Sequence, residues 1–173
     1  GKYIWGAYSA RRAGIIWTNI VAERSLPIDL SAPEIENVIE NHRKLFEKAL
    51  EEKTLEIVKR YTVIANGNVD LQTISGNNLL RRLGEFDVLA YLPAQNIILN
   101  IECKEISRAY CAKDTKRVRE KLFGRPEKEI GYLERVEKRE AYLQENWKFV
   151  AELLKWPIST SSSPKVLSLF VTP

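Results

Sequence analysis

Two runs rich in apolar and β-branched residues flank a proline-led turn near the middle of the chain. The runs cover residues 86–92 and 97–104, and Pro93-Ala94-Gln95-Asn96 separates them. Proline at the entrance of so short a connection favours a tight turn, so the sequence predicts an antiparallel hairpin. This feature constrains the fold most, because a hairpin fixes which residues oppose one another and which share a face.

The register of this hairpin predicts a cluster of charged side chains. With the turn centred on its two middle residues, Asp87 falls opposite Glu102. Glu85 falls opposite Lys104, and the alternation of side chains puts both pairs on the same face. The other face is apolar throughout and is predicted to face the core; it carries Phe86, Val88, Ala90, Leu92, Ile97, Leu99, Ile101 and Cys103.

Two opposed carboxylates indicate a metal site. Directly opposed residues lie about 5 Å apart at Cβ, and like charges so placed destabilise a strand pair unless something compensates them. A divalent cation is the simplest compensation, and Mg²⁺, with Mn²⁺ as an alternative, suits one or two carboxylates plus waters and substrate phosphates. We therefore predict Asp87 and Glu102 as metal ligands. Lys104 is predicted to orient or help deprotonate a metal-bound water and to stabilise phosphate charge, with Glu85 as its partner.

The segments around the hairpin predict an α/β domain with the order αβββαβ. A capping box at residues 31–34 begins a helix whose apolar stripe continues to about residue 59. A strand at 61–65 ends at the turn residues 66–68, and a polar loop then leads to the hairpin. Beyond the hairpin we expect helices at 114–123 and 130–154 and a strand at 166–171.

The remaining composition sets broad limits. Residues 1–30, with a short strand at 15–17, are predicted to be an extension packed on a domain at 31–173. The chain has no methionine, opens on Gly1 and ends inside a strand, which suggests a fragment of a longer protein with additional domains. No apolar run of about 18 residues and no signal peptide is present, so we expect a cytoplasmic protein with no membrane partner. Cys103 and Cys111 are expected to be reduced thiols.

The hairpin residues resemble the signature of the PD-(D/E)xK nuclease superfamily, an acidic residue on one strand followed by Glu-x-Lys on the next. The chain reads Gly84-Glu85-Phe86-Asp87 and then Ile101-Glu102-Cys103-Lys104. The resemblance spans roughly residues 33–171 and implies a restriction-endonuclease-like core, a central mixed sheet flanked by helices. It implies a Mg²⁺-dependent deoxyribonuclease, with DNA favoured over RNA and a homodimer favoured if both strands are cut. It also points to Glu47 on the first helix as a third metal ligand.

Several alternatives stay open at this point. Glu47 shares a helix flank with Glu40 and Glu51, so it is equally a surface charge. Three basic groups, at 81–82, 113–121 and 135–139, could track a phosphate backbone or form solvated faces, because acids are interspersed with them. The rival function is a nucleic-acid-binding or targeting module of the same fold without activity, and a purely structural domain is a third reading. The roles of further polar residues are not assigned: Glu85, Arg135, Lys138 and Gln144.

Overall fold

The computed structural model describes residues 6–22, 33–106, 112–125, 129–158 and 162–173. The chain forms two compact units, Gly1–Phe46 and Glu47–Pro173. The first unit contains α1 (Ala7–Ala22) and the beginning of α2 (Pro33–Lys59). The predicted extension at 1–30 falls in this unit, and its packing on the rest of the chain stays a prediction.

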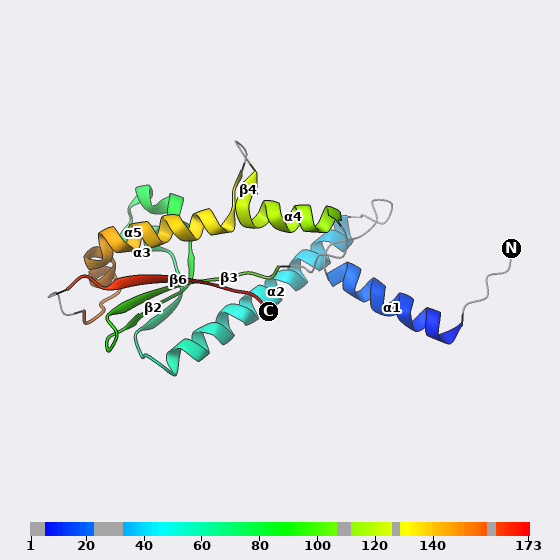
Figure 1. The fold of residues 1–173 in the computed structure, drawn as a ribbon, viewed down its shortest axis with the longest axis horizontal. Helices are drawn as coiled ribbons and strands as arrows, with labels where there is room; N and C mark the ends of the chain where they lie inside the picture. Colours follow the sequence, from blue (N-terminus) through cyan, green and yellow to red (C-terminus); the bar gives the residue numbers. More distant parts are fainter. Residues whose placement is uncertain (1–5, 23–32, 107–111, 126–128, 159–161) are drawn as a thin grey trace. The chain divides into compact units, whose positions relative to one another are not determined.

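A mixed four-stranded sheet forms the centre of the second unit (Figure 1). Its strand order is β1-β2-β3-β6; β1 and β3 both run antiparallel to β2, and β6 runs parallel to β3. The prediction of an α/β fold with a central mixed sheet flanked by helices is confirmed. The four strands are β1 (Ala65–Val69), β2 (Phe86–Leu92), β3 (Ile97–Cys103) and β6 (Lys165–Val171).

The predicted hairpin and its register are both present. The β2–β3 ladder pairs Leu92 with Ile97 and Val88 with Ile101, which is the predicted alignment. The turn closes with a hydrogen bond from the Asn96 N–H to the Pro93 carbonyl (3.2 Å). Asn96 has φ of 53°, a left-handed conformation that asparagine tolerates better than most residues. The turn therefore fixes the register that sets Asp87 opposite Glu102 at the other end of the hairpin.

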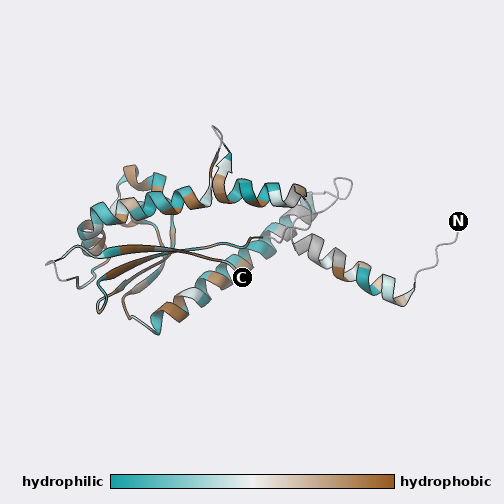
Figure 2. Ribbon diagram, in the orientation of Figure 1, coloured by the Kyte–Doolittle hydropathy of each residue, from teal (hydrophilic) through white to brown (hydrophobic). Residues whose placement is uncertain are grey.

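Helices cover both faces of the sheet. α5 (Tyr132–Leu153) packs on one face over a core that includes Leu89, Tyr91 and Ile98. Residues 47–59 of α2 cover the other face, where Val58 packs with a smaller core. Figure 2 shows the strands as largely hydrophobic, with hydrophilic positions concentrated on the helices. The face predicted to be apolar does pack in a core, through Val88, Ala90, Ile101 and Cys103. The charged face is buried as well, because Leu89, Tyr91 and Ile98 lie on the same face as Glu102.

Two predicted strands differ from the structure. Residues 15–17 belong to α1, since a short apolar run fits a helix as well as a strand. The strand expected at 61–65 lies at Ala65–Val69, so the predicted turn Asn66-Gly67-Asn68 is part of β1. Asn68 does adopt a positive φ of 52°, but inside the strand. A Cβ on Gly67 would lie 2.9 Å from the Leu55 side chain, so this glycine lets α2 approach the sheet closely.

Short elements that the sequence did not predict connect β1 to β2. Asp70 caps α3 (Leu71–Ser75) and Asn77 caps the 3-10 helix η2 (Asn78–Leu83), each by accepting backbone N–H bonds. The helices predicted near 114–123 and 130–154 are α4 (Ala112–Phe123) and α5, with a two-stranded sheet of β4 (Gly124–Arg125) and β5 (Glu129–Ile130) between them. No helix in the described ranges is long and apolar enough to span a membrane.

Candidate functional site

Three of the four predicted site residues meet at the open end of the hairpin. Asp87 is 7% exposed and Glu102 2% exposed, and Lys104 follows directly after β3. The Lys104 Nζ lies 2.9 Å from Asp87 Oδ2 and 3.4 Å from Glu102 Oε1. The structure therefore brings both carboxylates to one ammonium group, an arrangement we call the carboxylate cluster (Asp87, Glu102 and Lys104).

Backbone groups fix Asp87 and Lys104 in this cluster. Asp87 lies one residue beyond the last regular pair of the ladder, and its Oδ2 accepts a 2.7 Å hydrogen bond from the Cys103 N–H. Lys104 Nζ also donates to the Cys103 carbonyl (2.9 Å). Glu85, expected as the partner of Lys104, is exposed, and Lys104 pairs with Asp87 and Glu102 instead.

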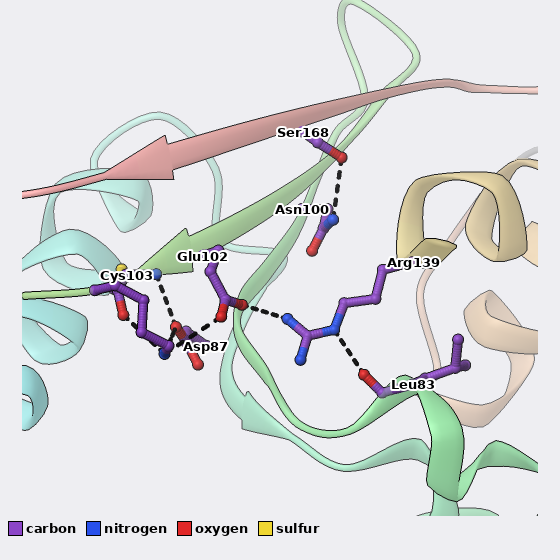
Figure 3. A network of polar contacts seen from close by, with 8 residues as sticks. Leu83, Asp87, Asn100, Glu102, Cys103, Arg139 and Ser168 are labelled. Carbon is purple, nitrogen blue, oxygen red and sulfur yellow. Dashed lines mark hydrogen bonds and ion pairs between the residues drawn. The ribbon is translucent and has the colours of Figure 1, made fainter. Parts of the chain in front are cut away.

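Arg139 of α5 holds Glu102 from the opposite side (Figure 3). One guanidinium nitrogen donates to Glu102 Oε2, and Nε donates to the Leu83 carbonyl (2.7 Å). The guanidinium also lies 5.1 Å from the centroid of the Phe86 ring. Gly84 has a φ of 67°, and a Cβ there would lie 3.3 Å from Arg139 Nη2. The lack of a side chain at Gly84 thus allows the positive φ before β2 and leaves room for the Arg139 guanidinium.

Sequence reasoning missed Arg139, although a signal for it exists. Arg139 lies three residues after Val136 and four before Leu143, both of which are buried on α5. It therefore falls on the apolar stripe of the helix, and at 5% exposure it is buried with them. A charged residue on such a stripe needs a buried partner, and Glu102 provides it.

Opposing effects keep Lys104 positively charged. Burial lowers the pKa of Lys104, but the charges of Glu102 and Asp87 outweigh it, and the net pKa lies above the ordinary value. A lysine with a raised pKa retains its proton at neutral pH. In this state it can stabilise negative charge, and the predicted help in deprotonating a metal-bound water stays a prediction.

The α2 carboxylate coupled to the cluster is Glu51. Burial, and then repulsion by Asp87, raise the pKa of Glu51 to about 7, while Lys104 lowers it. Glu47, the predicted third ligand, lies one helical turn earlier and is half-buried. Its charge also raises the pKa of Glu51, but less than those of Asp87 and Glu85. The place of Glu47 in a metal shell stays a prediction, and Glu51 joins it as a candidate.

The donor atoms of the cluster fit a small, oxygen-preferring cation. The described part of the chain holds no group of three or more His, Cys, Asp and Glu side chains placed to bind a metal. Mg²⁺, however, needs one or two carboxylates and completes its shell with water and phosphate. Asp87 and Glu102 already share one cation, the Lys104 ammonium, at hydrogen-bond and ion-pair distances. These residues therefore fit a two-carboxylate site.

Other polar residues considered from the sequence make their described contacts away from the cluster. Gln144 accepts from the Val166 N–H (3.1 Å) and donates to the Pro164 carbonyl, which ties α5 to β6. Lys138 pairs with Glu134 at 2.8 Å, and Arg135 lies over the Tyr132 ring. Burial raises the pKa of Cys103 to about 11, so its thiol stays protonated; Cys111 is outside the described residues.

The cluster combines anionic oxygens with fixed positive charge. No family model, curated protein or solved structure matches the chain. Function therefore has to be inferred from the residues and their geometry. Two buried carboxylates can hold a divalent cation, and a lysine with a raised pKa beside them can bind an oxyanion. A phosphodiester, which needs both, fits this combination.

Proposed function

We propose that the chain is a metal-dependent endonuclease that hydrolyses DNA phosphodiester bonds with activated water. One observation carries the proposal: the Lys104 ammonium lies between two buried carboxylates, Asp87 and Glu102, that come from neighbouring strands. Burying so many charges is costly, and perturbed charged clusters of this kind concentrate at functional sites. The resemblance to the PD-(D/E)xK superfamily and its restriction-endonuclease-like core supports the same reading.

Each residue of the cluster has a defined task in this proposal. Asp87 and Glu102 hold Mg²⁺ or Mn²⁺, and Glu47 or Glu51 of α2 completes the shell. The bound metal supplies a Lewis acid and a water of lowered pKa. Lys104 stabilises negative charge that develops on the phosphate, because its own pKa is raised and it stays cationic. Arg139 fixes Glu102 through its bonds to Oε2 and to the Leu83 carbonyl.

The alternative is a nucleic-acid-binding or targeting module without catalytic activity. It is favoured by the ion pairs themselves, since Lys104 and Arg139 already neutralise the two carboxylates. It is also favoured by the lack of a three-ligand group among the described residues. This alternative predicts salt-sensitive binding of DNA and no cleavage with any metal. DNA is proposed ahead of RNA, and a homodimer is proposed if both strands are cut.

Cleavage assays separate the two functions. Supercoiled plasmid and branched DNA are incubated with Mg²⁺ or Mn²⁺ and the wild-type chain, Asp87→Asn or Lys104→Ala. Each substitution is expected to lower the rate by about 100-fold or more, and a chelator is expected to abolish cutting. Glu56→Gln and Lys48→Ala, exposed charges on α2, are matched controls that should leave the rate unchanged. Unfolding curves verify that each variant is folded.

Two results would contradict the nuclease proposal. The first is unchanged cutting by folded Lys104→Ala, which would remove the cluster from the chemistry. The second is the absence of cutting by the wild-type chain with either metal on every substrate. Salt-sensitive DNA binding in that second case would establish the binding module instead.

A further inference from the structure

A basic cleft opens on the α5 side of the sheet, next to the carboxylate cluster. Its volume is about 1040 Å³, and it is lined by η2, the end of α4, β5 and α5. Two acidic residues also line it, Glu120 and Glu145. The cleft unites the three basic groups that are separate in the sequence. Six of its fourteen lining residues are basic: Arg81, Arg82, Lys121, Arg135, Lys138 and Arg139.

The 3-10 geometry of η2 turns two arginines toward the cleft. Leu80 and Leu83 are both buried, and a spacing of three residues puts them on the same side of a 3-10 helix. Arg81 and Arg82 consequently lie on the exposed side. Neither makes an ion pair with any residue in the described ranges. Their charges are thus available to a ligand.

The ion pairs around the cleft leave it positively charged. Glu120 is balanced by Arg125 at 2.8 Å and by Lys116 at 4.0 Å. Lys138 is balanced by Glu134 and Arg139 by Glu102. After these pairs are removed, three arginines without an acidic partner among the described residues, Arg81, Arg82 and Arg135, face one remaining acid, Glu145. Unpaired arginines gathered in a concave surface favour a polyanion.

Two tyrosines in the cleft each have an arginine beside them. The Arg135 guanidinium lies 5.8 Å from the centroid of the Tyr132 ring. Tyr142 is near enough to Arg82 to be influenced by its charge. Both tyrosines are only partly exposed, so their rings are held by packing. A partly exposed aromatic ring with an arginine close by can stack a base and contact the adjoining phosphate at once.

We infer that this cleft binds unpaired nucleotides and that single-stranded nucleic acid, in an open strand, flap or loop, is the substrate class of the proposed nuclease. Stacking on a tyrosine requires the face of a base, and a duplex covers those faces with neighbouring base pairs. Arg139 both lines the cleft and holds Glu102, so it links the cleft to the carboxylate cluster. The inference rests on the proposed function for the identity of the ligand as nucleic acid.

Binding without catalysis tests the inference directly. The full chain is titrated into a fluorescein-labelled oligothymidylate of about 20 nucleotides in the presence of a chelator, and anisotropy is measured across a range of salt. The double variant Arg81→Ala/Arg82→Ala is expected to bind about tenfold more weakly. The slope of log K against log salt should fall by about 1.4, because each phosphate contact on a single strand contributes about 0.7.

The tyrosines and a matched control sharpen this result. Tyr142→Leu is expected to weaken binding by about fivefold to hundredfold, whereas Tyr142→Phe keeps the ring and the affinity. Lys53→Ala/Arg60→Ala removes two exposed charges of α2 and should leave both affinity and slope close to wild type. Unfolding curves accompany each variant, because Tyr142 also packs against the core.

Three outcomes would overturn the inference. One is a self-complementary hairpin duplex that binds more tightly than the oligothymidylate. Another is inorganic polyphosphate that competes equally well per phosphate, which would indicate anion binding alone. The third is equal weakening by the Arg81/Arg82 and Lys53/Arg60 double variants.

Failure of the inference and failure of the nuclease proposal give different results. Cleft-dependent binding of oligothymidylate with no cleavage under Mg²⁺ or Mn²⁺ would retain the cleft and reject the nuclease. Metal-dependent cleavage at an unchanged rate by Arg81→Ala/Arg82→Ala and by Tyr142→Leu would retain the nuclease and reject the cleft as its substrate site.

Discussion

The two ends of the β2–β3 hairpin are built from different chemistry. At the turn end, the Asn96 side chain accepts from the Tyr91 hydroxyl and donates to Ser162 Oγ, both at 3.0 Å. Its carbonyl accepts from the Lys165 N–H, also at 3.0 Å. At the open end, the contacts join ionised groups, with Glu102 held between Lys104 and Arg139. One end is neutral and the other is charged, on the same pair of strands.

The neutral contacts at the turn end hold the hairpin closed, whereas the open end exposes the hairpin's strands to a group of charged side chains that need not be there for the turn to form. Neutral hydrogen bonds at an exposed turn cost little to form, and they join the turn to the segment before β6. Buried ion pairs carry a large desolvation cost, and apolar residues of similar size often do as well or better for stability. The ion pairs at the open end therefore add little net stability to the pairing of the two strands. This desolvation cost is why we propose a chemical role for the open end and not a purely structural one.

The largest expected effect on stability comes from breaking the buried ion pair between Glu102 and Arg139 at the open end. Arg139→Ala leaves Glu102 buried with Lys104 as its remaining cation, and we expect the free energy of unfolding in urea to fall by about 3–5 kcal/mol. Lys138→Ala, which removes an exposed pair with Glu134, is the control and should cost less than about 1 kcal/mol. If both variants lose the same small amount, the open end is not energetically distinct.

An apolar replacement of the same pair sharpens that result. Glu102→Leu combined with Arg139→Met removes both charges and keeps similar volumes, so the stability should lie within about 1 kcal/mol of wild type. Cleavage should nevertheless be lost, because Glu102 is a proposed metal ligand. Retained cleavage in a stable double variant would show that the pair is not needed for the chemistry.

A pH dependence centred on Glu51 is the next effect. The pKa of Glu51 is about 7 in the folded chain against 4.5 for an ordinary glutamate, so the folded state favours the protonated carboxyl. Stability from this group is complete below pH 4.5 and is lost as pH rises through 7. Glu51→Gln should raise the unfolding free energy at pH 8 by roughly 1.5 kcal/mol, about half of the fully shielded value.

The same variant should match wild type at pH 4.5, where Glu51 is already largely protonated in the folded state. Thermal unfolding midpoints at both pH values measure the difference, with about 2–4 °C expected per kcal/mol. Glu56→Gln, on the exposed side of α2, is the control. An equal effect of Glu51→Gln at both pH values would contradict the coupling between Glu51 and Asp87.

The sequence could predict the open end of the hairpin because the hairpin is local. A turn at 93–96 fixes the alignment of residues six places away on each strand, so the meeting of Asp87 with Glu102 follows from the alternation of side chains. Arg139 is different, since it reaches Glu102 only through the packing of α5 on the sheet. Nothing in the spacing of residues 102 and 139 encodes that contact. Arg81 and Arg82 likewise reach the cleft only because η2 forms, and the sequence around its cap, Asn77, reads equally well as a polar loop.

One misplaced strand and one undecided choice of carboxylate both come from competing local signals. Asn66-Gly67-Asn68 carries turn residues, but pairing with β2 draws Ala65–Val69 into the sheet. On α2, Glu47 and Glu51 lie one turn apart on the same flank, and periodicity gives them equal weight. Only the packing of α2 on β2 and β3 brings Glu51 under the influence of Asp87 and Lys104.

The smallest expected effect on stability comes from a substitution at the turn end, which tests whether that end serves folding alone. Asn96→Gly keeps the positive φ of 53° without strain and removes the side-chain bonds to Tyr91 and Ser162. We expect a loss of about 1 kcal/mol in the free energy of unfolding, the usual contribution of neutral hydrogen bonds at a partly exposed site. Cleavage per folded molecule should not change, since the turn is far along the strands from Asp87. A loss of cleavage without a loss of stability would mean that the turn, too, serves the chemistry.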